Sequence, residues 1–231
     1  MTVQIDFVPS DYPSPHLEEA AEPIASFVHG SVSLLPELNT FMRLTGNENF
    51  RRTADIWLNQ FIRNRRKESP DKIHLADLLR NVLSVVADLS EWNELRGILA
   101  EKVFEGYFKE KHTGKLMGYG VIVRIDGRKV IYSPLTTKED DGRRRTVDAG
   151  SWDGDFGEFA EVKFSPEGFG TKELGYLKLL EKRLDDVNVS HQIYLVSFDD
   201  NDITQGRLQR KGLLEDPSRF EILGLQDIQA F

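Results

Sequence analysis

The chain has 231 residues, of which 39% are hydrophobic and 29% are charged, the balance of a globular protein long enough for one large domain or two small ones. Cysteine is absent, which excludes disulfides and thiolate zinc sites. The formal net charge of −8 argues against non-specific coating of nucleic acid, which needs basic residues to neutralise phosphates. Since neither a basic leader with an apolar stretch nor an apolar run of membrane-spanning length is seen, we expect a cytoplasmic protein with no membrane partner.

The first part of the chain is predicted to be helical. Residues 1–15 contain three prolines and predict an extended arm. Apolar residues then recur at helical spacing, in a helix ending at Gly30, in a second within 50–67 and in a third after Pro70. We expect residues 1–89 to form a helical N-terminal region that could contact nucleic acid, bind a protein partner or support a homodimer.

From residue 90 onward the periodicity predicts a mixture of helices and strands. A long helix at 91–111 is followed by two strands around a tight turn at Asp126–Gly127, and by two more strands around a turn at 153–157. An amphipathic helix at 171–186 leads into an apolar strand at 191–198. This order predicts an α/β (α+β) fold, with residues 90–231 as the second domain.

Three charged residues of this region are predicted to meet on one patch of the sheet. Glu161 and Lys163 are two residues apart on a predicted strand, so their side chains share a face, while Val162 points the other way. If the turn is centred near residue 155, Asp148 lies opposite Glu161 on the neighbouring strand. Two carboxylates can seat a magnesium ion, and an adjacent lysine can orient water or stabilise charge on a phosphate.

The motif around these residues resembles a known signature. An aspartate in the context VD, thirteen residues before AEVKF, is similar to the D…(E/D)xK pattern of the PD-(D/E)xK, or restriction-endonuclease-like, superfamily. The resemblance implies a core of helix, three strands, helix and strand over residues 91–198, with a central mixed sheet flanked by helices. It also implies a nuclease that hydrolyses phosphodiester bonds, DNA in preference to RNA, with Asp148 and Glu161 as ligands of Mg²⁺ or Mn²⁺. Lys163 would assist the attacking water.

The same resemblance suggests further site residues. Many members carry a metal-binding glutamate on the first core helix, shortly after a glycine, and Glu101 after Gly97 suits that position. Glu105, one turn further along, is its rival. Gln192, entering the last core strand, takes a place where some relatives have a polar active-site residue.

Two departures and one basic cluster complete the predicted site. Val147 stands where the superfamily name has proline, and Asp153, which is followed by glycine, rivals Asp148. Its spacing of eight from Glu161 would put Asp153 in the turn, so Asp148 is preferred. The basic residues Arg143, Arg144 and Arg145 precede the strand of Asp148, and we expect them to contact a phosphate backbone.

Two simpler interpretations remain open at this stage. Glu161 and Lys163 could form an exposed ion pair, although apolar residues on both faces of their strand favour an interior position. The whole domain could also be a nuclease-like fold kept as a non-catalytic binding or assembly module. Metal dependence distinguishes that module from an enzyme.

Overall fold

A computed structural model describes residues 3–10, 14–63, 69–133, 144–214 and 220–230. The chain divides into two compact units. One is helical and consists of Pro13–Tyr107, and the other combines Met1–Tyr12 with Phe108–Phe231. Helix α5 (Leu89–Lys111) contributes to both, because the division falls between Tyr107 and Phe108.

The helical unit is built from the predicted amphipathic segments and one further helix. Its members before α5 are α1 (Pro15–Gly30), the short η1 (Val32–Leu34), α2 (Leu35–Leu44), α3 (Phe50–Arg63) and α4 (Pro70–Val85). Helix α4 packs against both α1 and α3. Pro15 and Pro70 open their helices, where the missing N–H costs nothing, and the predicted end at Gly30 is confirmed.

An aromatic core holds the helical unit together. Trp92 is fully buried, and its indole N–H donates to the carbonyl oxygen of Thr45 at 2.8 Å. Its ring stacks on Phe50 with centroids 5.6 Å apart, and Phe41 meets it edge-on. This polar handle satisfies the only donor of the indole inside an otherwise apolar core.

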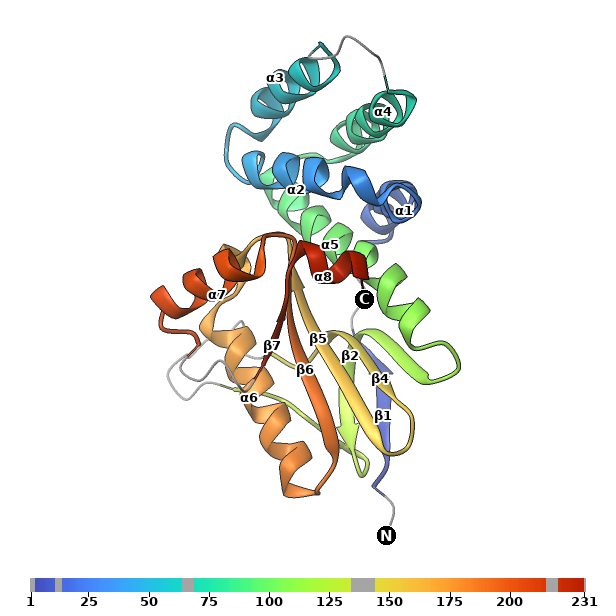
Figure 1. The fold of residues 1–231 in the computed structure, drawn as a ribbon, viewed down its shortest axis with the longest axis vertical. Helices are drawn as coiled ribbons and strands as arrows, with labels where there is room; N and C mark the ends of the chain where they lie inside the picture. Colours follow the sequence, from blue (N-terminus) through green and yellow to red (C-terminus); the bar gives the residue numbers. More distant parts are fainter. Residues whose placement is uncertain (1–2, 11–13, 64–68, 134–143, 215–219, 231) are drawn as a thin grey trace. The chain divides into compact units, whose positions relative to one another are not determined.

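The second unit is an α/β structure around a mixed sheet that has seven strands within the described residues (Figure 1). The strands are β1 (Ile5–Pro9), β2 (Leu116–Ile125), β3 (Arg128–Lys129), β4 (Val147–Trp152), β5 (Phe156–Lys163), β6 (Ser190–Ser197) and β7 (Glu221–Leu223). Their order is β1-β2-β4-β5-β6-β7, with β3 paired to β2. The β5–β6 and β6–β7 pairs are parallel and the others antiparallel, which leaves β5 in the interior of the sheet.

The two faces of the sheet are covered by different helices. Helix α6 (Thr171–Asp186) connects β5 to β6 and runs along the sheet beside β6 (Figure 1). Its leucines enter the same core as Phe159 of β5. Tyr194 of β6 instead meets Lys111, at the end of α5, on the opposite face. The predicted helix at 171–186 is therefore confirmed, and it covers the face that carries Phe159 and Glu161.

The predicted domain boundary at residues 89 and 90 needs correction. The expected arm contains β1, which pairs with β2 in the register Ile5 with Ile125, so the start of the chain belongs to the sheet. Helix α5 belongs to the helical unit as far as Tyr107. The pairing of β1 joins segments more than a hundred residues apart, and local periodicity carries no information about it.

The C-terminal part adds elements that were predicted only as one short strand or helix. After β6 come α7 (Asn201–Arg210), β7 and α8 (Leu225–Ala230). Among the described residues, no helix combines the length and the apolar character needed to cross a bilayer.

Two glycines give a direct test of this backbone. Gly127 has a φ of 76° in the turn between β2 and β3, whereas Gly206 lies inside α7, where an added Cβ would meet no described atom within 4 Å. Gly127→Ala should lower the free energy of unfolding by about 1 kcal/mol, and Gly206→Ala should raise it by up to about 1 kcal/mol. Urea unfolding of both variants measures the two changes, and changes of the same sign would contradict the backbone described.

Candidate active site

The structure brings Asp148 and Glu161 together as their spacing predicts. Strands β4 and β5 pair in the register Ala149 with Ala160, and one further step places Asp148 opposite Glu161. Both carboxylates are buried, with 5% of Asp148 and none of Glu161 exposed. We refer to these two residues as the carboxylate pair.

Lys163 bridges the carboxylate pair. Its Nζ donates to Asp148 Oδ2 at 3.2 Å and to Glu161 Oε1 at 2.6 Å. The backbone N–H of Val162 also donates to Asp148 Oδ2, at 2.7 Å. A Cβ at Gly168 would lie 3.1 to 3.2 Å from three carbons of the Lys163 side chain, so the glycine makes room for the lysine stem.

Arg144 is the second cation of the site. Its Nη2 lies 2.6 and 2.5 Å from the two carboxylate oxygens of Glu161 and 3.2 Å from Asp148 Oδ1. Arg144 therefore faces the carboxylate pair in this structure, although its predicted role was contact with phosphate. Arg145 is exposed, and Arg143 lies outside the described residues.

Helix α6 adds two residues that the sequence motif did not indicate. Glu173 Oε1 lies 3.8 Å from Nη1 of Arg144, and its Oε2 accepts the N–H of Gly170 at 3.1 Å. Tyr176 is fully buried and lies within the electrostatic influence of Arg144 and Glu161. The position of Glu173, three residues after the helix N-cap, was the available signal, since acids there commonly cap a helix.

The two members of the carboxylate pair titrate differently. Burial alone would raise the pKa of Asp148, but the charges of Lys163 and Arg144 and the N–H of Val162 together hold that pKa below its ordinary value. Burial raises the pKa of Glu161, and the charge of Asp148 raises it further, against the opposing effects of Lys163 and Arg144. One carboxyl is thus held ionised while its neighbour accepts a proton more readily.

The oxygen donors at this position suit a hard divalent cation. Magnesium is commonly held by one or two carboxylates together with water and substrate phosphates, and the carboxylate pair supplies that number. Glu101 and Glu105 are half-buried residues of α5 in the helical unit. Within the described part of the chain, no group of three or more histidine, aspartate or glutamate side chains is placed to hold a metal.

The other two predicted candidates lie elsewhere in the sheet. Gln192 pairs with Glu158 in the β5–β6 register, three residues before Glu161. Asp153 lies in the β4–β5 turn, where its Oδ1 accepts the N–H groups of Asp155 and Phe156 at 3.0 and 2.8 Å. Asp153 therefore caps the turn, as its spacing suggested.

Glu158 is a buried carboxylate of β5 that the sequence analysis did not single out. Its Oε1 accepts the hydroxyl of Tyr194 at 2.6 Å and lies 3.0 Å from Nζ of Lys111. His112 Nδ1 lies 3.3 Å from Glu158 Oε2. Burial lowers the pKa of His112 to about 4 against the opposing charge of Glu158, so the imidazole is neutral at pH 7. These contacts satisfy Glu158 within the protein.

Comparisons with known proteins add little to this geometry. No family model matches the sequence, and no curated protein matches it. Among solved structures, a crystal structure of protein VC1899 from Vibrio cholerae matches with a TM-score of 0.43 and 15% identity. The match covers 99% of this chain and 56% of that protein, so the chain spans little more than half its length. A similarity this weak identifies neither a family nor an activity.

The short contacts predict that Arg144 and Glu161 are strongly coupled. Breaking a buried ion pair leaves one charge without its partner, so a cycle of Arg144→Ala, Glu161→Gln and the double variant should give a coupling energy of at least about 1.5 kcal/mol. Lys182 and Asp186 serve as the control, because their pair is 68% and 46% exposed. The same cycle there should give about 0.5 kcal/mol or less. Equal coupling in the two cycles, measured by urea unfolding, would show that burial adds nothing to the Arg144 contact.

Proposed function

We propose that the protein is a metal-dependent nuclease whose chemical centre is the carboxylate pair with Lys163. The observation that carries the proposal is the burial of two adjacent carboxylates inside the sheet, bridged by an ammonium group. Buried charges are costly, and they persist where they pair with one another or serve a site. Their arrangement fits hydrolysis of a phosphodiester, with DNA as the first substrate to test.

The carboxylate pair would hold Mg²⁺ or Mn²⁺. Both side chains offer oxygen ligands from neighbouring strands, and the lowered pKa of Asp148 keeps at least one of them ionised at neutral pH. When bound, a divalent ion supplies water of lowered pKa and neutralises charge that develops on the phosphate.

Lys163 is the residue best placed to act on the reacting atoms. Its ammonium group contacts both carboxylates, and 22% of its side chain is exposed, compared with 5% of Asp148 and none of Glu161. An ammonium group held in this way can hydrogen-bond the attacking water or stabilise negative charge on a phosphate oxygen. The two carboxylates fix its position for either role.

Arg144 would neutralise charge and contact phosphate. Its planar guanidinium group matches either a carboxylate or a phosphate through paired hydrogen bonds. Its side chain is 18% exposed, so the group that faces Glu161 also borders solvent. Exchange of a carboxylate contact for a phosphate contact would reconcile the observed position of Arg144 with its predicted role.

One observation favours a second candidate, a non-catalytic binding or assembly module. Each oxygen of the carboxylate pair already accepts a hydrogen bond from Arg144, Lys163 or the N–H of Val162. A network that is complete without a ligand can serve the fold alone. A module of this kind would keep its function when divalent ions are removed.

A cleavage assay separates the two candidates. Purified protein is incubated with supercoiled DNA, linear DNA, single-stranded DNA and RNA, each with Mg²⁺, with Mn²⁺ or with EDTA. We expect cleavage that EDTA abolishes and that Lys163→Ala slows by at least about 100-fold, because the variant removes the group that orients water or stabilises charge.

Lys182→Ala is the matched control, since this lysine is exposed and forms a surface ion pair with Asp186. It should cleave at the wild-type rate, and thermal melting should show that both variants remain folded. Equal cleavage by wild type and Lys163→Ala, or none by the wild type with either metal, would favour the non-catalytic module.

A further inference from the structure

A pocket with an accessible volume of about 500 Å³ lies between the β2–β3 turn and the C-terminal end of α6. Pockets that bind small molecules are commonly about 300 to 1,000 Å³ in volume. It is lined by Ile125, Asp126, Arg128, Lys129, Val130, Arg183, Asp186 and Val187.

The lining residues leave an excess of unsatisfied positive charge. Both acids are engaged, because Asp126 Oδ1 accepts the backbone N–H of Gln4 at 3.0 Å and Asp186 accepts Lys182 at 2.9 Å. The three basic residues, by contrast, form no ion pair or side-chain hydrogen bond with any described residue: Arg128, Lys129 and Arg183. In a chain of net charge −8, three unpaired cations around one pocket require a separate explanation.

The walls of the pocket suit a ligand with both an anionic and an apolar part. Ile125 and Val130 are buried, at 7% and 4% exposure, and Val187 packs against the same core. Arginine presents a planar fork of donors that matches phosphate oxygens, and lysine adds a mobile point charge. A phosphate ester combines the anion with an organic body that apolar walls can cover.

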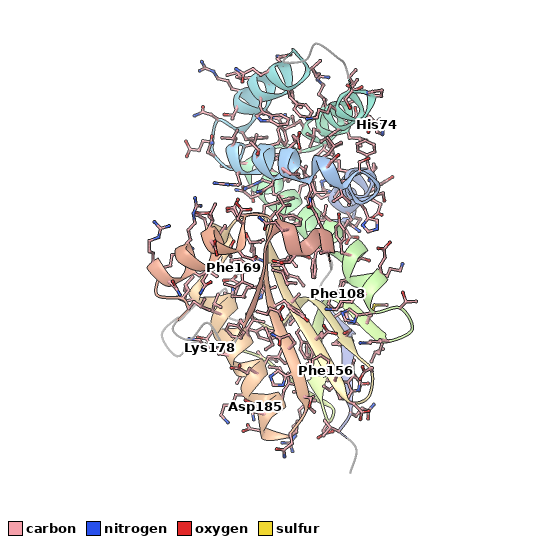
Figure 2. The ribbon with its side chains drawn as sticks, in the orientation of Figure 1. His74, Phe108, Phe156, Phe169, Lys178 and Asp185 are labelled. Atoms are coloured by element: carbon pink, nitrogen blue, oxygen red, sulfur yellow. The ribbon has the colours of Figure 1, made fainter. Side chains whose placement is uncertain are left out.

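The pocket is separate from the carboxylate pair. Glu173, in the first turn of α6, approaches Arg144, whereas Arg183 lies ten residues further along the same helix. At 1.5 Å per residue this separation is about 15 Å along the helix axis. Figure 2 labels Phe169, just before α6, and Asp185, near its end, and shows them at opposite ends of the helix.

We propose that Arg128, Lys129 and Arg183 form a binding site for a phosphate ester. Two sources share this chemistry: a free nucleotide seated in the pocket, or a backbone phosphate of a nucleic-acid strand that extends from the carboxylate pair. The site follows from its own charges and walls, so it does not require cleavage at the carboxylate pair.

Binding measured in EDTA tests the site in the absence of cleavage. The probes are ATP, followed by calorimetry, and a fluorescein-labelled single-stranded oligonucleotide of about 20 nucleotides, followed by polarisation. The Arg128→Ala/Arg183→Ala variant should weaken binding of at least one probe by about tenfold or more, and should lower the salt dependence of oligonucleotide binding by about two phosphate contacts. Arg210→Ala, on α7, is a control that removes one charge away from the pocket and should leave binding unchanged.

Each outcome has a defined meaning. Loss of ATP binding assigns the pocket to a free nucleotide, loss of oligonucleotide binding alone assigns it to a strand, and both support the phosphate-ester site. Binding of neither probe at millimolar concentration, equal binding by wild type and the double variant, or an equal loss in Arg210→Ala would overturn it. Failure of the proposed nuclease would be seen separately, as wild-type DNA that stays intact with Mg²⁺ and Mn²⁺.

Discussion

The burial of two like-charged carboxylates on adjacent strands is the constraint on which the rest of the site depends. Asp148 and Glu161 are brought opposite one another by the β4–β5 register, where their repulsion and desolvation would together oppose folding. Lys163 and Arg144 offset that cost with contacts of 2.5 to 3.2 Å. Since the two cations are partly exposed and the acids are not, the positive groups form the face that a phosphate would meet first.

The interior strand β5 carries charge on both of its faces, and the two faces differ in what surrounds them. Glu158 is enclosed by Tyr194, Lys111 and His112, and these contacts account for its burial within the protein. Glu161, on the other face, has a second acid as its neighbour, and burial and that acid together raise its pKa. A carboxyl raised in this way beside one that stays ionised is a common arrangement in catalytic sites, which is why the proposal rests on this face.

The sequence predicts the parts of this structure that short-range spacing controls. The helix at 171–186, the turn at Asp126–Gly127 and the convergence of Asp148, Glu161 and Lys163 all follow from periods of 3.6 or 2 and from the length of one turn. Spacing does not predict β1, whose partner strand is distant in the chain. Nor does it predict the position of Arg144, because a long side chain with several rotatable bonds can reach either solvent or a buried acid.

Binding of Mn²⁺ to the metal-free protein, measured by calorimetry, tests the central claim most directly, because it needs no knowledge of the substrate. Wild type should bind the ion saturably, Asp148→Asn should weaken binding by at least about tenfold, and Glu158→Gln, which alters the buried acid of the opposite face, should leave it unchanged. No binding by wild type, or equal binding by wild type and Asp148→Asn, would contradict the assignment of Asp148 and Glu161 as the metal site.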